Sequence, residues 1–116
     1  MAYSAVTGAR LWVARYNGPG NRDDVAGSVA VSPGGGRVLV TGGSQGSGSG
    51  QDYATVAYSA VTGARLWVRR YNGPGNRDDE AFSLAVSPSG TRVFVTGFSY
   101  DGAATGYDSA TVAYRP

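Results

Sequence analysis

An internal repeat is the feature that most constrains how this chain can fold. The segment YSAVTGARLWV at residues 3–13 returns at residues 58–68, an offset of 55. When residues 3–43 are aligned with residues 58–98, eight of the 41 positions differ and 33 are identical. In the first copy the differing positions are Ala14, Val25, Gly27, Val29, Gly34, Gly36, Leu39 and Gly43. Because a fixed repeat period marks an array of one small structural unit, we expect the chain to contain two such units.

The repeat continues to the end of the chain. DYATVAY at residues 52–58 matches DSATVAY at residues 108–114, and a one-residue insertion makes this offset 56. We therefore divide the 116 residues into a first repeat, residues 1–57, and a second repeat, residues 58–116.

Each complete unit contains four segments with the composition of β-strands. These segments are rich in Val, Thr, Tyr and Trp and are bounded by clusters of Gly, Pro, Asn and Asp, a pattern typical of strands joined by turns. SPGGGR and SPSGT supply the Pro and Gly that tight turns need. The expected strands of one unit lie at residues 28–32, 37–42, 53–59 and 65–71.

These strands are apolar on both faces. In RLWVRRY at residues 65–71, Leu66 and Val68 point to one side, while Trp67 and Tyr71 point to the other. A sheet with one face in water would instead alternate apolar and polar residues. Small four-stranded sheets that are covered on both faces by copies of themselves are β-propeller blades. We therefore predict an all-β fold, a β-propeller with two four-stranded antiparallel blades per chain and a blade slightly longer than usual.

The segment AYSAVTGARLW, at residues 2–12 and again at 57–67, resembles a known motif. It is similar to the tryptophan-docking motif of quinoprotein-type propellers, roughly A-x-D-x-x-T-G-x-x-x-W, although Ser4 and Ser59 replace the usual Asp or Asn. The segments AVSPSGTRVFVTG and DYATVAY are similar to bacterial seven-bladed propeller repeats of predicted secreted and surface proteins. The resemblance implies that packing between adjacent blades involves Trp12, Trp67, Gly8, Gly63, Thr7 and Thr62.

The resemblance implies neither a quinone nor its calcium, because the matching motif is the packing element and not the cofactor pocket. We therefore expect no cofactor. Proteins of this family are often secreted or located on the cell surface, but no basic-then-apolar leader follows Met1, so the sequence leaves the location open.

The composition excludes several classes of function. Without Cys and His, the chain has no disulfides, no thiolate or imidazole metal sites and no Ser-His-Asp triad. All ten cationic residues are Arg, the net charge is only +2, and the Arg residues are scattered, so we expect no nucleic-acid partner. No run of about 18 apolar residues occurs, so we expect no membrane-spanning helix and no membrane partner.

The order of the expected strands predicts how copies of the chain assemble. The chain begins with the end of a third strand and an isolated fourth strand at residues 10–16, and it closes with a unit that lacks its fourth strand. The isolated strand of one copy can complete the open unit of the next, in a head-to-tail contact that forms a ring if the rotation closes. A homotrimer would have six blades and a homotetramer eight; the docking motif favours eight. Ends of this kind also suggest an excised or designed fragment of a longer propeller, with a short natural gene as the alternative.

The longest connections are expected on one face of the blades, where we place any ligand, since binding residues concentrate on loops held by a rigid scaffold. These connections are NGPGNRDD at residues 17–24, its copy, and the segments 44–52 and 99–108. The candidate ligand-face residues are Asn17, Arg22, Asp23 and Asp24, their counterparts Asn72, Arg77, Asp78 and Asp79, and the pair Tyr100 and Tyr107.

The repeated loops could bind phosphate, bind Ca²⁺ or only stabilise their own turns. GPGNRDD precedes a strand and not a helix, so it lacks the context of a phosphate-binding loop. Asp23, Asp24, Asp78 and Asp79 offer a partial oxygen set for Ca²⁺. We favour the alternative that one Asp of each pair accepts backbone N–H bonds in its own turn while the other is solvated. The two tyrosines could stack on sugar rings, but we favour a covering role.

We predict that the chain is not an enzyme. Paired carboxylates could hydrolyse glycosides, but near-identical copies around a ring are a poor way to give two groups different pKa values. The expected function is that of a structural module that assembles with itself. The alternative is a binding module for a protein or glycan that uses the long-loop face.

Overall fold

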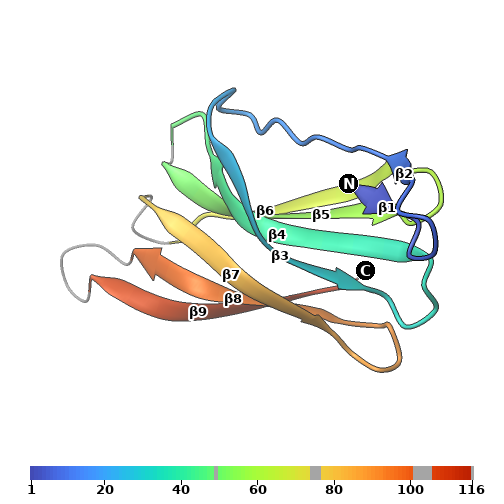
Figure 1. Cartoon of the computed structure of the whole chain (residues 1–116). Helices are drawn as coiled ribbons and strands as arrows, with labels where there is room; N and C mark the ends of the chain where they lie inside the picture. The colour runs from blue at the N-terminus through green and yellow to red at the C-terminus, as the bar shows by residue number, and fades with distance from the viewer. Residues whose placement is uncertain (49, 74–76, 101–105, 116) are drawn as a thin grey trace.

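The computed structural model describes residues 1–48, 50–73, 77–100 and 106–115. They form three antiparallel β-sheets of two, four and three strands (Figure 1). The all-β prediction is confirmed, since every element found in these ranges is a strand. A helix able to cross a membrane is accordingly not found in this part of the chain.

The four-stranded sheet contains one complete unit of the repeat. Its strands are β3 (Asp24–Val31), β4 (Arg37–Gln45), β5 (Gln51–Ser59) and β6 (Arg65–Tyr71). They pair in chain order, each antiparallel to the next, so each connection is a hairpin. Gly35 and Gly63 have φ angles of 75° and 76° in the first and third of these turns, in the left-handed region that favours glycine.

The three-stranded sheet repeats this arrangement without the last strand. Its strands are β7 (Asp79–Val86), β8 (Val93–Tyr100) and β9 (Tyr107–Tyr114). The register is the same in both sheets, since Val40 pairs with Val56 in the first and Val95 pairs with Val112 in the second. β9 is the counterpart of β5, and the described residues place no strand along the edge that corresponds to the position of β6.

The two-stranded sheet is formed by the start of the chain, where β1 (Ala2–Tyr3) pairs with β2 (Arg10–Trp12). The predicted strand at residues 10–16 is therefore too long. In the complete unit, β6 is held along its length by β5. In the N-terminal sheet, β1 pairs only with Arg10–Trp12, and residues 13–16 have no neighbouring strand to pair with among the described residues.

β6 has the predicted bounds, residues 65–71, whereas β3, β4 and β5 extend beyond theirs. β3 begins at Asp24 instead of residue 28, β4 ends at Gln45 instead of 42, and β5 begins at Gln51 instead of 53. The reason is a bulge between Ala26 and Ser28, which allows pairing to continue to the end of the hairpin. A Cβ at Gly42 would collide with the Val25 carbonyl oxygen, so glycine is required opposite this bulge.

The core lies between the two larger sheets. It is formed by Leu39, Tyr53 and Ala57 from the first sheet and by Ala81, Leu84, Val93 and Val95 from the second. The hydroxyl of Tyr53, a fully buried residue, donates a hydrogen bond to the Ala110 carbonyl oxygen at 3.0 Å and joins the sheets. Because apolar burial contributes about 25 cal/mol per Å², this layer is the main stabilising contact between the repeats.

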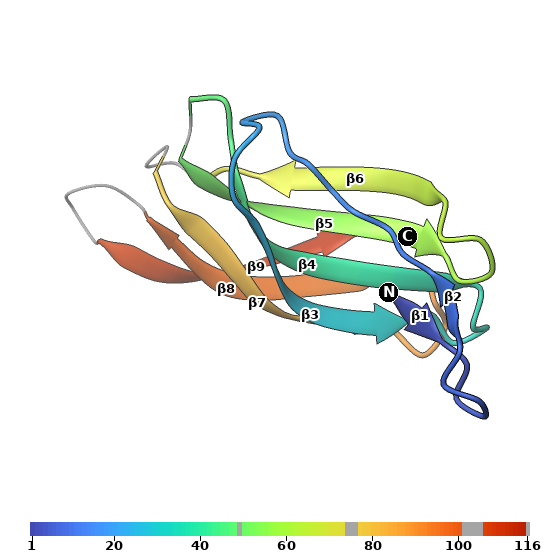
Figure 2. The same cartoon turned by 45° about the horizontal axis from the view of Figure 1, so that its top comes forward.

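The N-terminal segment lies on the opposite side of the first sheet. The chain between β2 and β3 runs along the outer face of that sheet, away from β7, β8 and β9 (Figure 1). The view in Figure 2 also places β1 and β2 at the end of the sheet where β3 finishes. The first sheet is thus covered on one face by the second sheet and on the other only by this extended segment.

Candidate functional site

A polar network lies where the first YNGPGNRDD segment meets the first sheet. Asp24, at the start of β3, accepts a hydrogen bond from the Gly18 amide at 3.1 Å and another from the Ser44 hydroxyl on β4. A Cβ at Gly18 would collide with Ser44 Oγ and lie 2.9 Å from Asp24 Oδ1. The glycine of the repeated loop is therefore required for the packing of this network.

Arg70 on β6 completes the first network. Its guanidinium donates to Ser44 Oγ at 2.7 Å, to the Ser44 carbonyl oxygen at 2.9 Å and to the Tyr16 hydroxyl at 3.0 Å. It also forms an ion pair with buried Asp52 on β5 at 3.2 Å. Because charge-assisted hydrogen bonds are roughly twice as strong as neutral ones, Arg70 firmly connects β4, β5 and the N-terminal segment.

The second sheet contains the same network around Asp79, which is fully buried. Asp79 accepts hydrogen bonds from the Gly73 amide at 2.9 Å, the Ser99 hydroxyl at 2.5 Å and the Tyr100 amide at 3.2 Å. By the repeat, Asp108 corresponds to Asp52 and Arg15 corresponds to Arg70. Arg15 is exposed in the N-terminal segment, whereas the second sheet lacks a fourth strand that could carry such an arginine among the described residues.

The geometry of the two Asp pairs differs from that of a cation site. In the part of the chain that the structure describes, no three carboxylates gather as potential metal ligands. Both oxygens of Asp24 and of Asp79 accept hydrogen bonds from amide and hydroxyl donors. Asp23 is exposed, and Asp78 accepts a hydrogen bond from the Gln51 amide at 3.1 Å. Asp24 and Asp79 thus accept the backbone amide bonds expected of one Asp in each pair, whereas Asp78, expected to be solvated, also accepts a bond from the first sheet.

Four of the remaining candidate ligand residues are exposed outside the strands, whereas Tyr100 is half-buried at the end of β8 and Tyr107 is exposed at the start of β9. Asn17 donates its side-chain amide to Asn21 at 2.6 Å, and Arg22 and Asn72 are also exposed. The guanidinium of Arg77 lies 5.0 Å from the centre of the Tyr100 ring, and the Tyr100 and Tyr107 rings are 5.1 Å apart. The predicted long loops extend through residues 49, 74–76 and 101–105, which lie outside the described residues.

Trp12 attaches the N-terminal segment to the turn between β5 and β6. Its Nε1 donates a hydrogen bond to the Ala60 carbonyl oxygen at 2.9 Å. The indole packs directly on Gly63, where a Cβ would lie 2.7 Å from Trp12 Cδ2. Thr62 and Ser59 stabilise the same turn, since Ser59 Oγ accepts from the Thr62 amide at 3.3 Å and Thr62 Oγ1 from the Ala64 amide at 3.2 Å.

Trp67, the counterpart of Trp12, does not make this contact with any residue that the structure describes. Its Nε1 is buried and has no hydrogen-bond partner among the described residues. The counterpart of Gly63 is Gly8, which has a φ of 75° and no atom within 4 Å of its Cβ position. The turn around Gly8 is preformed, since Ser4 Oγ accepts from the Thr7 amide at 3.1 Å and Thr7 Oγ1 from the Ala9 amide at 3.2 Å.

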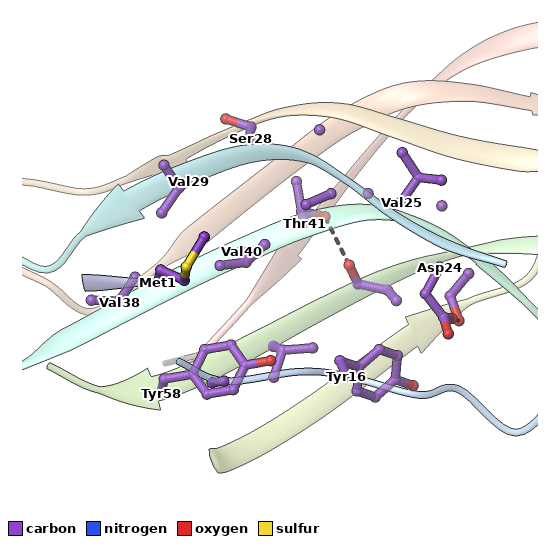
Figure 3. Close-up of a pocket in the computed structure, with 18 of the residues that line it drawn as sticks. Met1, Tyr16, Asp24, Val25, Ser28, Val29, Val38, Val40, Thr41 and Tyr58 are labelled. Atoms are coloured by element: carbon purple, nitrogen blue, oxygen red, sulfur yellow. Dashed lines mark hydrogen bonds between the residues drawn. The ribbon is translucent and has the colours of Figure 1, made fainter. Parts of the chain in front are cut away.

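A groove of about 500 Å³ lies between the N-terminal segment and the outer face of the first sheet (Figure 3). Tyr16 and Trp12 line one side, and apolar residues of β3 and β4 such as Val29 and Val40 line the other. Val29 is 64% exposed. The groove is therefore an apolar surface in contact with water.

Burial raises the pKa of three tyrosines. The pKa of Tyr53 is raised to about 12, mainly by burial and also by the negative charge of Asp79. Burial likewise raises the pKa of Tyr58 and of Tyr114. These phenols remain protonated near neutral pH, which keeps Tyr53 a hydrogen-bond donor to the second sheet.

No family model, curated protein or solved structure matches this chain. The fold and the site alone therefore define its class, an all-β protein of two repeats. In particular, Trp12 makes one tryptophan contact inside the chain, and the described residues contain no such contact for its counterpart Trp67.

Sequence reasoning did not identify Ser44, Asp52 and Arg70 as members of a network. The signal that could have found them is that each recurs unchanged in the other repeat, as Ser99, Asp108 and Arg15. Polar residues that recur on three different strands indicate a shared contact, because polar groups at buried positions need partners.

Proposed function

We propose that this chain is a structural module that assembles with copies of itself, head to tail, into a closed β-propeller, without catalysis of its own. The observation that carries the proposal is the packing of the two larger sheets on each other. One face of the first sheet contacts one face of the second. Because the repeats share most of their residues, the two faces left over can meet in the same orientation, with different side chains at a few positions.

The exposed side chains support this pairing. Leu39 of the first sheet and Leu84 of the second are buried against each other's sheets. Their counterparts on the two remaining faces are Phe94, which is 42% exposed, and Val29, which is 64% exposed. Contiguous exposed apolar surface marks an interaction site, and the Phe94 face of one copy placed on the Val29 face of the next would repeat the internal contact.

The open strand edge supports the same arrangement. Residues 10–16 of one copy would add to β9 of another, as β6 adds to β5 within the chain. Arg15 would then meet Ser99 and Asp108 as Arg70 meets Ser44 and Asp52. Completion of a sheet by a strand from another chain supplies main-chain hydrogen bonds, while the arginine sets the register.

The same head-to-tail step accounts for Trp67, whose Nε1 has no hydrogen-bond partner among the described residues. A neighbour's turn at residues 4–9 would lie beside Trp67 as the turn around Gly63 lies beside Trp12. The Trp67 Nε1 would then donate to the neighbour's Ala5 carbonyl oxygen, and the indole would cover Gly8. An unsatisfied buried donor costs about 1–3 kcal/mol, so this contact favours assembly.

The size of the ring follows from two units per chain. Three copies give six blades and four give eight, and a seven-bladed ring is impossible if each unit is used. We favour eight, on the resemblance of AYSAVTGARLW to the tryptophan-docking propellers, with six as the alternative.

The test is the mass in solution, measured by light scattering after size exclusion at several dilutions. We expect three or four times the chain mass of 11.9 kDa, independent of dilution. Arg15→Glu places a carboxylate opposite Asp108 and should shift the mass toward the monomer, whereas the control Arg22→Glu makes the same charge change in an exposed loop and should not. A folded wild-type monomer at all concentrations would refute the proposal.

A second candidate function is the binding of a protein or glycan on the long-loop face. The observation that favours it is the pair of adjacent rings of Tyr100 and Tyr107, the latter 58% exposed. Titration with a glycan panel, with and without Ca²⁺, separates the two functions. The scaffold proposal expects no saturable binding, while binding that is lost in Tyr107→Ala would establish the second function.

A further inference from the structure

The second repeat carries an aromatic cluster that the first repeat lacks. The rings of Phe82 and Phe98 are 5.2 Å apart, those of Phe98 and Tyr107 are 5.1 Å apart, and Tyr107 also contacts Tyr100. The cluster lies on the face of the second sheet that is not packed against the first, where Phe82 is 53% exposed. The corresponding residues of the first repeat are Gly27, Gly43, Gln51 and Gln45.

In the first repeat, the two glycines allow a close approach between sheets. A Cβ at Gly27 would lie 2.8 Å from the Ala81 carbonyl oxygen, which is too close for a side chain without a shift of the backbone. A Cβ at Gly43 would lie 3.3 Å from Cγ of Glu80. The contact inside the chain therefore places the backbone of β7 and the stem of Glu80 directly over a glycine surface.

The same contact between two copies would involve different residues. Phe82 and Phe98 stand at the positions of Gly27 and Gly43, and Val25 of the next copy stands at the position of Glu80. Val25 is 55% exposed in the single chain. In the contact between copies, apolar Val25 therefore takes the place of charged Glu80, and Phe82 and Phe98 take the places of Gly27 and Gly43.

We propose that the assembly alternates two kinds of interface. The close interface lies inside each chain, through Gly27 and Gly43, and the wider one lies between chains, where Phe82 and Phe98 of one copy pack on Val25 of the next. This inference rests on the head-to-tail assembly proposed above. The spacing must alternate, because the 2.8 Å separation at Gly27 leaves no room for the side chain of Phe82.

The alternation specifies which faces pair. If the Phe98 face of one copy displaced the first sheet from the second sheet of another, Phe98 would contact Glu80, and a carboxylate would lose water beside an aromatic ring without compensation. If the Val25 face of one copy displaced the second sheet from the first sheet of another, the glycine surface would meet Val25 and leave a void. Each incorrect pairing is energetically unfavourable, so the differences between the repeats favour one order of the sheets.

The test exchanges the two residues that distinguish the interfaces. Val25→Glu should raise the concentration at which half of the assembly dissociates by at least about ten-fold, since it places a carboxylate against Phe82 and Phe98. The matched control Glu80→Val alters only the interface inside the chain and should leave that concentration within about two-fold of the wild type. Val25→Glu is expected to fold, because Glu80 occupies the same position in the second repeat.

A rescue variant separates this effect from general damage. Val25→Glu combined with Phe82→Gly and Phe98→Gly recreates the residues of the close interface between chains and should recover assembly relative to Val25→Glu alone. Assembly of Val25→Glu at wild-type strength would overturn the alternation and leave the ring proposal standing. A wild-type protein that is already monomeric would overturn both, and circular dichroism of each variant excludes loss of folding as the cause.

Discussion

The hydroxyl of Tyr53 gives a quantitative prediction about the contact between the two sheets. Tyr53→Phe removes its hydrogen bond to the Ala110 carbonyl oxygen and keeps the buried ring. That carbonyl oxygen retains a bond from Thr96 Oγ1 at 3.3 Å, so it is not left unsatisfied. At pH 8 we therefore expect the variant to be less stable by only about 1 kcal/mol.

The order of stability should reverse in alkali. The pKa of Tyr53 is about 12 in the folded chain, against the ordinary value of 10.0. A raised pKa means that the folded state holds the proton more tightly, so the stabilisation is complete below pH 10 and is lost as the pH rises toward 12. Two pKa units correspond to at most about 2.7 kcal/mol, and we expect about 1.5–2.7 kcal/mol after allowing for solvent screening near the edge of the interface.

Urea unfolding of both proteins, at one protein concentration and at pH values from 8 to 12, measures this effect. The contributions of the other tyrosines cancel in the difference between the two free energies of unfolding. Tyr53→Phe should become the more stable protein above roughly pH 11, given the magnitudes above. A constant difference across this range would refute the reasoning, because it would mean that ionisation of Tyr53 does not oppose folding.

Three further substitutions, two of them with a matched control variant, test other contacts. Asp79→Asn should destabilise the chain by about 2–3 kcal/mol in urea unfolding, because the carboxylate is fully buried and accepts charge-assisted bonds; the exposed neighbour Asp78→Asn should change stability little, and equal effects would contradict this assignment. Gly63→Ala and Gly8→Ala carry the same strain of about 1–2 kcal/mol from a positive φ, but at concentrations where the chain is monomeric only Gly63→Ala should also shift the fluorescence of Trp12, since its Cβ meets the indole. Trp12→Phe should cost about 1 kcal/mol or more through loss of the bond to the Ala60 carbonyl oxygen, and an unchanged urea midpoint would exclude that role.

The fold class followed from local features of the sequence. Turn residues such as Pro33 and Gly35, together with the β-branched residues in the segments between successive turns, predicted the hairpins. The structure contains these hairpins. The predicted start of β3 and end of β4 were wrong because a bulge cannot be recognised from composition. The glycine at position 42 has the pattern of a strand end, yet it permits pairing to continue to Gln45.

The candidate site was only partly accessible to sequence reasoning. The Asp24 and Asp79 positions were identified from the repeated loop. Ser44, which bonds Asp24, and Arg70, which bonds Ser44, lie on other strands, 20 and 46 residues beyond Asp24. Such contacts depend on the register of three strands, which the sequence pattern does not specify to one residue. The missing partner of Trp67 could be recognised only after the geometry of Trp12 was known.

The pairing of the strands also has a consequence for the kinetics of folding. In both larger sheets each strand pairs only with its neighbour in the chain, so hairpins can form independently, typically within about 1–10 μs. The bond between Tyr53 and Ala110 instead joins residues 57 positions apart. Docking of one sheet on the other must therefore close a long loop, and we expect it to be the slow step, preceded by two separately formed sheets whose apolar faces are open to water.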